Sequence, residues 1–168
     1  MSFYTSDQIN NIAEAIRKLF GYKDSDYFID ITQIASKAGV EVNEVDFDDP
    51  DISGTLVTNK NKQVINVNRN DSEERKRFTI AHEVAHAILH PTKQENHVDY
   101  RQALKNYTTR DQLSREFQAN MLAAALLMPT GLVKNAWSKL KDVDDLADLF
   151  KVSKRAAAIR LESLGLLY

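Results

Sequence analysis

Apolar residues recur with the period of amphipathic helices along most of the chain. This period predicts helices over the first twenty residues, over 29–38, 73–89 and 109–128, and in two or three segments after 131. Glycine and proline commonly end helices. Here Gly39 follows the segment 29–38, Pro91 follows 73–89, and Pro129 and Gly131 follow 109–128. The apolar positions expected in the core are Ile9, Ile12, Ile16 and Leu19 near the start and Leu146, Leu149, Ile159, Leu161 and Leu164 near the end.

Between residues 40 and 68 the pattern changes to that of β-strands. Residues 40–45 predict one strand, and 54–58 and 63–68 predict a hairpin around the polar stretch 59–62. Residues 91–108 are expected to form a long loop. Together these elements predict an α+β fold that is predominantly helical, with a small three-stranded antiparallel or mixed sheet.

Composition limits the possible classes of protein. A length of 168 residues with 43% hydrophobic residues suits one domain over 1–168, with helices and the first strand in 1–50, a core in 51–130 and a helical region in 131–168. No membrane span is expected, because the longest apolar run, 121–128, is far shorter than the roughly 20 residues needed. Zero cysteines exclude disulfides and thiolate metal ligands and favour a cytoplasmic location. A net charge of -2 makes nucleic acid an unexpected partner, and nothing indicates an oligomeric state.

The helix predicted over 73–89 contains the motif His82-Glu83-Val84-Ala85-His86, and Asp71 and Glu74 resemble a capping box at its start. Because positions i and i+4 lie on one helix face, both imidazoles can reach one metal ion. Glu83 would then lie beside the open position of the metal and take a proton from water, which is the chemistry of peptide hydrolysis. A helical histidine pair can also be a hydrogen-bonded part of the core. Here, however, both histidines border an apolar stripe, which suits half-buried ligands and consists of Phe78, Ala81, Ala85, Ile88 and Leu89.

A catalytic zinc ion usually has three protein ligands, so the two histidines need a partner. His90 lies about 12 Å beyond His82 along the helix axis and cannot share the ion. Glu116 is the preferred third ligand because it begins the next predicted helix, which can pack antiparallel to the first. A solvated helix charge is the alternative interpretation of Glu116, and His97 and Glu95 are weaker candidates for the ligand.

Two supporting roles can also be considered. Asn120 falls on the same helix face as Glu116, one turn later, and its amide could accept a hydrogen bond from the second ring nitrogen of a liganding histidine. Hydrolysis also needs a donor for the developing oxyanion. His97, Tyr100 and Tyr107 are candidates, and the sequence favours none of them.

Three segments occur in the order typical of one known family: residues 77–90, Glu116 to Asn120, and Leu126-Leu127-Met128-Pro129. They resemble the ImmA/IrrE-type metallopeptidases, most firmly between residues 54 and 129. The resemblance implies a zincin-like metallopeptidase fold with a gluzincin-like site, in which His82, His86 and Glu116 bind zinc and Glu83 is the general base. Manganese or another divalent ion also suits these ligands.

The resemblance also implies a substrate. Members of the family are typically cytoplasmic proteases of phages, mobile elements and stress responses that cleave a helix-turn-helix repressor, so such a repressor is the expected partner. In zinc peptidases the substrate lies extended along a sheet edge, and the strand at 54–58 is expected to provide that edge.

Two alternative functions remain. Residues 144–166 have the rhythm of a helix-turn-helix, which would suit a DNA-binding regulator, but Asp144, Asp145 and Asp148 make its first helix negative. The chain could instead be a non-catalytic, metal-binding anti-repressor. Glu83 argues against this reading, because a closed structural metal site has no use for it.

Overall fold

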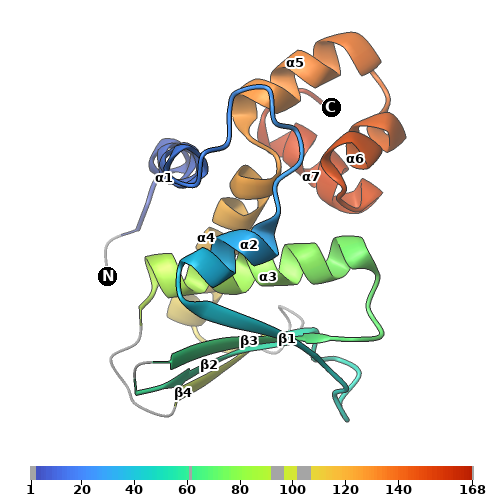
Figure 1. Ribbon diagram of the computed structural model, residues 1–168. Coiled ribbons are helices and arrows are strands. Elements are labelled where there is room, and N and C mark those ends of the chain that lie inside the picture. Colours follow the sequence, from blue (N-terminus) through green and yellow to red (C-terminus); the bar gives the residue numbers. More distant parts are fainter. Residues whose placement is uncertain (1–2, 61, 92–96, 102–106, 168) are drawn as a thin grey trace. The chain divides into compact units, whose positions relative to one another are not determined.

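The computed structural model describes residues 3–60, 62–91, 97–101 and 107–167 (Figure 1). The chain divides into two compact units, Asp30–Asn120 and the combination of Met1–Ile29 with Met121–Tyr168. The family resemblance and the motif helix both fall mainly in the first of these, which we call the central unit. The second, which we call the terminal unit, is helical. The single domain predicted over 1–168 stays a prediction.

The central unit contains a sheet of four described strands, one more than the three predicted. The strands are β1 (Val40–Val45), β2 (Gly54–Asn59), β3 (Lys62–Asn68) and β4 (His97–Arg101), in the order β1-β3-β2-β4. β1 runs parallel to β3, and β2 is antiparallel to both β3 and β4. The sheet is therefore mixed, and the predicted hairpin at β2 and β3 is confirmed.

Strand β4 corrects two predictions. It lies within the predicted loop 91–108, and it occupies the side of β2 that was expected to be a free edge. The sequence concealed it because its alternation is inverted: Val98 and Tyr100 are exposed, while Asp99 and Arg101 pair with Leu56 and Gly54 of β2. Leu56 is buried, and antiparallel partners point to the same face, so the polar side chains of β4 face inward.

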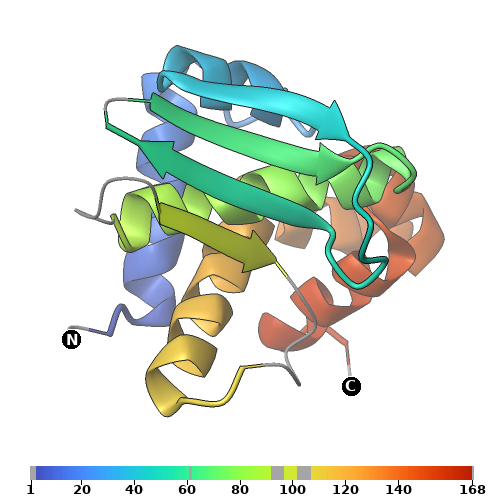
Figure 2. The same ribbon diagram turned by 90° about the horizontal axis from the view of Figure 1, so that it is seen from below.

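Two helices of the central unit, α2 (Ile31–Lys37) and α3 (Glu73–Leu89), lie on the same face of the sheet (Figure 1). Figure 2 looks onto the opposite face, with α3 behind the strands. The bounds of α3 match the prediction. Its N-cap is Ser72, whose hydroxyl accepts from the Arg75 amide, whereas the predicted capping box at Asp71 was one residue early. Asp71 instead pairs with the Arg75 side chain at 3.1 Å.

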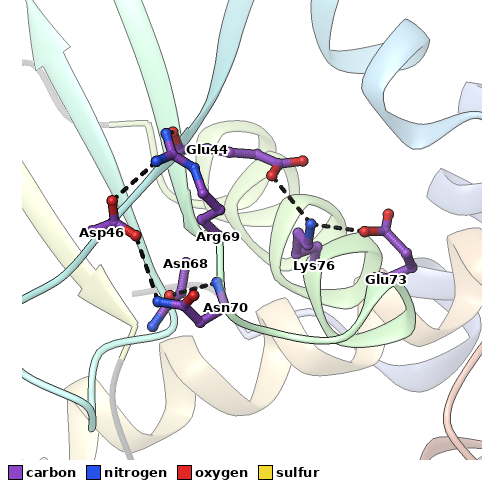
Figure 3. Close-up of polar contacts among 7 residues, drawn as sticks. All are labelled: Glu44, Asp46, Asn68, Arg69, Asn70, Glu73 and Lys76. Carbon is purple, nitrogen blue, oxygen red and sulfur yellow. Dashed lines mark hydrogen bonds and ion pairs between the residues drawn. The ribbon is translucent and has the colours of Figure 1, made fainter.

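A polar cluster fixes the start of α3 against the ends of β1 and β3 (Figure 3). Lys76 on α3 pairs with Glu44 of β1 at 3.2 Å and with Glu73 at 2.7 Å. Arg69, just after β3, pairs with Asp46 at 3.0 Å and donates to the Glu44 carbonyl. Individual surface ion pairs stabilise little, but this network joins three elements and so orients the helix that carries the motif.

Gly54 lets β2 approach α3 closely. A Cβ at this position would collide with Thr79 Cγ2 and would lie 3.1 Å from the Asn66 carbonyl oxygen and 3.9 Å from Glu83 Oε1. The start of β2 therefore packs directly over the turn of α3 that links Thr79 to Glu83. Any larger residue would displace the sheet from the motif helix.

The predicted apolar stripe of α3 is only partly correct. Ala81, Ala85 and Leu89 are buried, but Ile88 is 42% exposed. The buried face is instead completed by His82 and His86, which lie deeper than the predicted edge position. Polar residues thus take core positions in this helix.

The terminal unit is formed by α1 (Ser6–Leu19), α5 (Thr130–Leu140), α6 (Val143–Phe150), α7 (Lys154–Ser163) and the end of α4 (Arg110–Leu127). Of the predicted core residues, Ile9, Leu146 and Leu161 are fully buried, Ile12, Ile16, Leu149 and Leu164 are intermediate, and Leu19 and Ile159 are exposed. Pro129 does end α4, but it also caps α5, which contains Gly131. In the described part of the chain, no helix has the length and apolar character to span a bilayer.

Two buried arginines satisfy the end of α4 within this unit. Arg17 donates to the carbonyls of Leu126 at 3.2 Å and Asp26 at 2.6 Å. Arg160 donates to the Met128 carbonyl at 3.0 Å, and also to side-chain oxygens at 3.0 Å and 3.1 Å that belong to Asn10 and Thr130. Positive donors at a helix C-terminus satisfy carbonyls that lack partners within the helix and complement its dipole.

Candidate metal centre

Helix α3 places His82, Glu83 and His86 together in the interior of the central unit. All three are buried, and the two histidines lie one turn apart with their ring centres 4.6 Å from each other. The first part of α4 adds Glu116, which is also buried, and Asn120 one turn later. The structure therefore brings together the residues that the sequence proposed from two separate helices.

The side-chain atoms of His82, His86 and Glu116 converge closely. The two Nε2 atoms lie 3.0 Å apart, and they lie 3.1 Å and 3.0 Å from the two carboxylate oxygens of Glu116. Ligands at roughly 2.0–2.1 Å from a tetrahedral ion are separated by about 3.3 Å. The observed spacing is close to that value, so this buried group could hold a metal ion.

The hydrogen bond to Asn120 determines which ring nitrogen of His82 is available. His82 Nδ1 lies 2.9 Å from Asn120 Oδ1, and an amide oxygen can only accept, so Nδ1 carries the proton. In the neutral ring, Nε2 then presents a lone pair toward the Glu116 carboxylate and toward His86. Several electron pairs directed at one point favour a cation between them.

The electrostatics of the group keep His82 neutral and Glu116 ionised. Burial lowers the pKa of His82 to about 4, and Glu116 only partly opposes this effect. Burial acts to raise the pKa of Glu116, but the close polar contacts with the imidazoles of His82 and His86 outweigh it and hold that pKa well below its usual range. Neutral imidazoles and a carboxylate are the forms in which these side chains bind metals.

Glu83 differs from its neighbours in having no partner among the described residues. Both carboxylate oxygens are buried and form no hydrogen bond to any described group. Burial raises the pKa of Glu83 to about 8, opposed chiefly by the positive charge of Arg101. A buried carboxylate without partners destabilises the fold by roughly 1–3 kcal/mol or more, so its retention needs a reason other than stability.

The other sequence candidates lie outside this group. His90 caps the end of α3, and burial lowers its pKa to about 4. His97 is hydrogen-bonded to Asp99 at 2.9 Å. Tyr100 is 51% exposed, and Tyr107 donates its hydroxyl proton to the Tyr100 carbonyl. Glu95 lies outside the described residues.

Sequence reasoning missed Arg101. This residue ends β4 and donates from Nη1 to the hydroxyl of Thr79 at 2.6 Å, one helical turn before Glu83. Its charge acts on Glu83, His82 and Glu116. The signal that could have found it was the alternation from His97 to Arg101, in which every second residue is ionisable.

Comparison with known proteins agrees with the resemblance seen in the sequence. Residues 35–162 match the sequence model of the peptidase M78 family, described as the IrrE N-terminal-like domain. The chain belongs to this family. The match includes the four clustered residues His82, Glu83, His86 and Glu116. No curated protein sequence matches the chain significantly.

Among solved structures, the chain is similar to a Mycobacterium tuberculosis transcriptional regulator. The TM-score is 0.66 at 18% sequence identity, a level at which the likeness concerns the fold alone. The match covers 95% of this chain but only 47% of the regulator, so the chain spans about half the length of that protein.

Proposed function

We propose that this member of the M78 family is a zinc-dependent endopeptidase. The observation that carries the proposal is the position of Glu83, whose two buried carboxylate oxygens have no described partner and lie next to a buried His-His-Glu group. A structural metal site needs only its ligands, whereas hydrolysis also needs a base beside them. Membership of the peptidase M78 family is consistent with this assignment.

In the proposed mechanism, His82, His86 and Glu116 hold the ion, which supplies Lewis acidity when bound. Asn120 keeps His82 in the tautomer whose Nε2 faces the ion. Glu83 accepts a proton from the attacking water and later returns it to the leaving amine nitrogen. Zinc is the metal we propose, although manganese and other divalent ions accept the same ligand types.

The substrate is proposed to bind as an extended strand along β4. The earlier expectation for β2 is not kept, because β2 is paired on both sides. β4 is the edge strand of the described sheet. The inward-facing side chain of Arg101, at the end of β4, reaches Thr79, and Thr79 and Glu83 both lie close to Gly54 of β2. Backbone hydrogen bonding to a sheet edge would align a peptide without requiring a particular sequence.

The proposed substrate is a helix-turn-helix transcriptional repressor of a phage, mobile element or stress response. We propose that it is cleaved in the cytoplasm. This part rests on the sequence resemblance to the ImmA/IrrE-type peptidases and on the family match. The structural neighbour that is a transcriptional regulator supports a connection with regulation. Because the chain spans about half of that regulator, the connection applies to the domain and not to a whole protein of that kind.

The proposed function is tested with the zinc-reconstituted chain and its Glu83→Gln and Glu116→Ala variants. Bound metal is measured per chain by elemental mass spectrometry. Each protein is then co-expressed with helix-turn-helix repressors from the same source, and fragments are mapped by mass spectrometry. We expect one metal ion in the wild type and in Glu83→Gln, little in Glu116→Ala, and cleavage by the wild type alone. A repressor inactivated equally by Glu83→Gln would instead indicate the non-catalytic anti-repressor.

A DNA-binding function is the second candidate, because α6 and α7 are joined by a three-residue turn in which Lys151 has a positive φ. The available charges disfavour it. Lys154 on α7 is paired with Asp144 of α6 at 2.8 Å, and Arg160 is buried. We therefore propose that this segment packs or docks a protein substrate. A salt-sensitive shift of duplex DNA at low salt would contradict this assignment.

A further inference from the structure

The proposed hydrolysis leaves one requirement without a residue, namely the donor that stabilises negative charge on the carbonyl oxygen. Of the two tyrosines considered from the sequence, one points outward and the other uses its hydroxyl in a hydrogen bond. Tyr100 lies on the outer, exposed side of β4, and the Tyr107 hydroxyl bonds the Tyr100 carbonyl. His97 is held by Asp99 at the far end of the strand from Arg101.

Arg101 lies where such a donor is needed. Arg101 is the pairing partner of Gly54 on β2. A Cβ added at Gly54 would lie 3.9 Å from Glu83 Oε1. Its guanidinium reaches across to Thr79 on α3 and lies 5.1 Å from the centre of the Phe78 ring. Thr79 and Glu83 are one turn apart on the face of α3 that meets Gly54. The guanidinium and the proposed base therefore share one small region of the central unit.

Neither the Arg101 guanidinium nor the Glu83 carboxyl forms an ion pair with another described residue. Among the described residues, no carboxylate lies within ion-pair distance of the Arg101 guanidinium, and the Glu83 oxygens form no hydrogen bond. Yet the positive charge of Arg101 acts on Glu83 and Glu116 and also on His82. A cation and a carboxyl group that are close in the fold but not bonded to each other leave room for a polar group to interact with each.

A peptide bond has the required complementary groups. Its carbonyl oxygen accepts hydrogen bonds, and guanidinium presents several N–H donors in a fixed plane. We propose that Arg101 is a further catalytic residue, which donates to the carbonyl oxygen of the scissile peptide bond opposite the water activated by Glu83. This assignment rests on the proposed peptidase function.

The step conserves atoms and charge. Glu83 takes a proton from water, the water oxygen forms a bond to the carbonyl carbon, and the carbonyl π electrons move to the oxygen that faces Arg101. When that electron pair reforms the carbonyl, the C–N bond breaks, and the nitrogen takes the proton from Glu83. The products are a carboxylic acid and an amine, and Arg101 stays protonated throughout.

The test uses inorganic phosphate as a tetrahedral oxyanion and the full chain loaded with Co²⁺, whose visible absorption reports on the metal and its neighbours. Phosphate is titrated into the wild type, Arg101→Met, Arg101→Lys and two controls. Arg75→Met removes a nearby charge that acts on Arg101 but is exposed and paired with Asp71. Lys62→Met removes an exposed charge on β3 of the same sheet, which is paired with Glu41.

We expect Arg101→Met to weaken phosphate binding at least about tenfold, Arg101→Lys to be intermediate, and both controls to stay within about twofold of the wild type. Equal affinity in wild type and Arg101→Met, or no spectral response to phosphate in either, overturns the assignment of Arg101. If Arg101→Met does not fold by circular dichroism, Arg101→Lys decides by the same criterion. A wild type that binds no Co²⁺ refutes the proposed metallopeptidase instead, which is a separate result.

Discussion

The two units of the chain treat buried charge in opposite ways. In the terminal unit, Arg17 and Arg160 are buried, and each donates to one carbonyl oxygen at or just after the end of α4. In the central unit, Glu83 is just as deeply buried, but neither of its oxygens has a described partner. Buried polar groups that meet partners contribute to stability, whereas those without partners destabilise the fold. Under the proposed function, the partnered arginines serve the fold, and the buried Glu83 serves the chemistry.

The largest expected effect is a loss of stability when a partnered, buried arginine of the terminal unit is removed. Arg160→Met should lower the free energy of unfolding by about 3 kcal/mol, because one buried acceptor, the Met128 carbonyl, and two part-buried acceptors lose a charged donor. Urea denaturation followed by circular dichroism measures the change. Arg155→Met is the matched control, since Arg155 is exposed on the same helix and should change stability by less than about 0.5 kcal/mol. Equal effects of the two substitutions would contradict the structural role.

The next effect concerns Asn120. It has a hydrogen-bond partner, as the two buried arginines do, but it lies at the candidate metal centre, as Glu83 does. Asn120→Ala should weaken metal binding by roughly ten- to a hundredfold, because His82 loses the acceptor that fixes its tautomer. Competition with a chromophoric chelator measures the affinity. Asn120→Asp keeps an acceptor oxygen and should bind metal at least as well as the wild type. A loss of the same size in both variants would show that the hydrogen bond is not what matters.

On the functional side of the comparison, removing Glu83 should stabilise the protein. Glu83→Met replaces a buried carboxylate without described partners by an apolar side chain of similar length, so the metal-free chain should gain about 1 kcal/mol. The same variant should have no peptidase activity. Thermal and urea unfolding provide the measurement, with Glu162→Met, at an exposed position, as the control. A marked loss of stability would mean that Glu83 has a structural task.

The smallest effect is a pH dependence of the metal-free chain. The pKa of His82 is lowered to about 4 in the folded state from an ordinary value of 6.5, so between these limits the unfolded chain binds the proton and the folded chain does not. The contribution of His82 to stability should therefore fall by about 1 kcal/mol between pH 7.5 and 5.5. The raised pKa of Glu83 acts in the opposite direction over the same range, so the His82 contribution is read as the difference between the wild type and His82→Gln. Urea unfolding at the two pH values tests this. On going from pH 7.5 to pH 5.5, the wild type should lose about 1 kcal/mol of stability relative to His82→Gln, and an equal change in both proteins would place the effect on another group.

Much of the central unit was predictable because its signals are local. The spacing of apolar residues indicated α3 with its bounds, the valines indicated β1, and the polar stretch at 59–62 indicated the hairpin of β2 and β3. The i and i+4 positions of His82 and His86 follow from helix geometry alone. The proposed partnership with Glu116 needed the resemblance to a family, and the close approach of the three side chains agrees with it. Their roles as ligands, and that of Glu83 as base, remain predictions.

The errors arose where packing between distant segments overrides local pattern. β4 was not predicted because its inward residues are ionisable and its outward residues apolar, the reverse of an ordinary surface strand. Ile88, Leu19 and Ile159 fit helical stripes yet are exposed, because periodicity identifies a face but not the extent to which neighbouring elements cover it. The cap of α3 moved by one residue, which is within the usual uncertainty of helix ends.

The sequence by itself determined the helical metal-binding motif, the family, and the α+β class, because each depends on residue types at short, fixed spacings. Only the tertiary structure decided that β4 pairs with β2, that Asn120 meets His82, and that Arg101 lies over Thr79 beside Glu83. These contacts join residues 22 to 47 positions apart. They depend on how strands and helices pack after the chain has folded, and no short-range pattern encodes that packing.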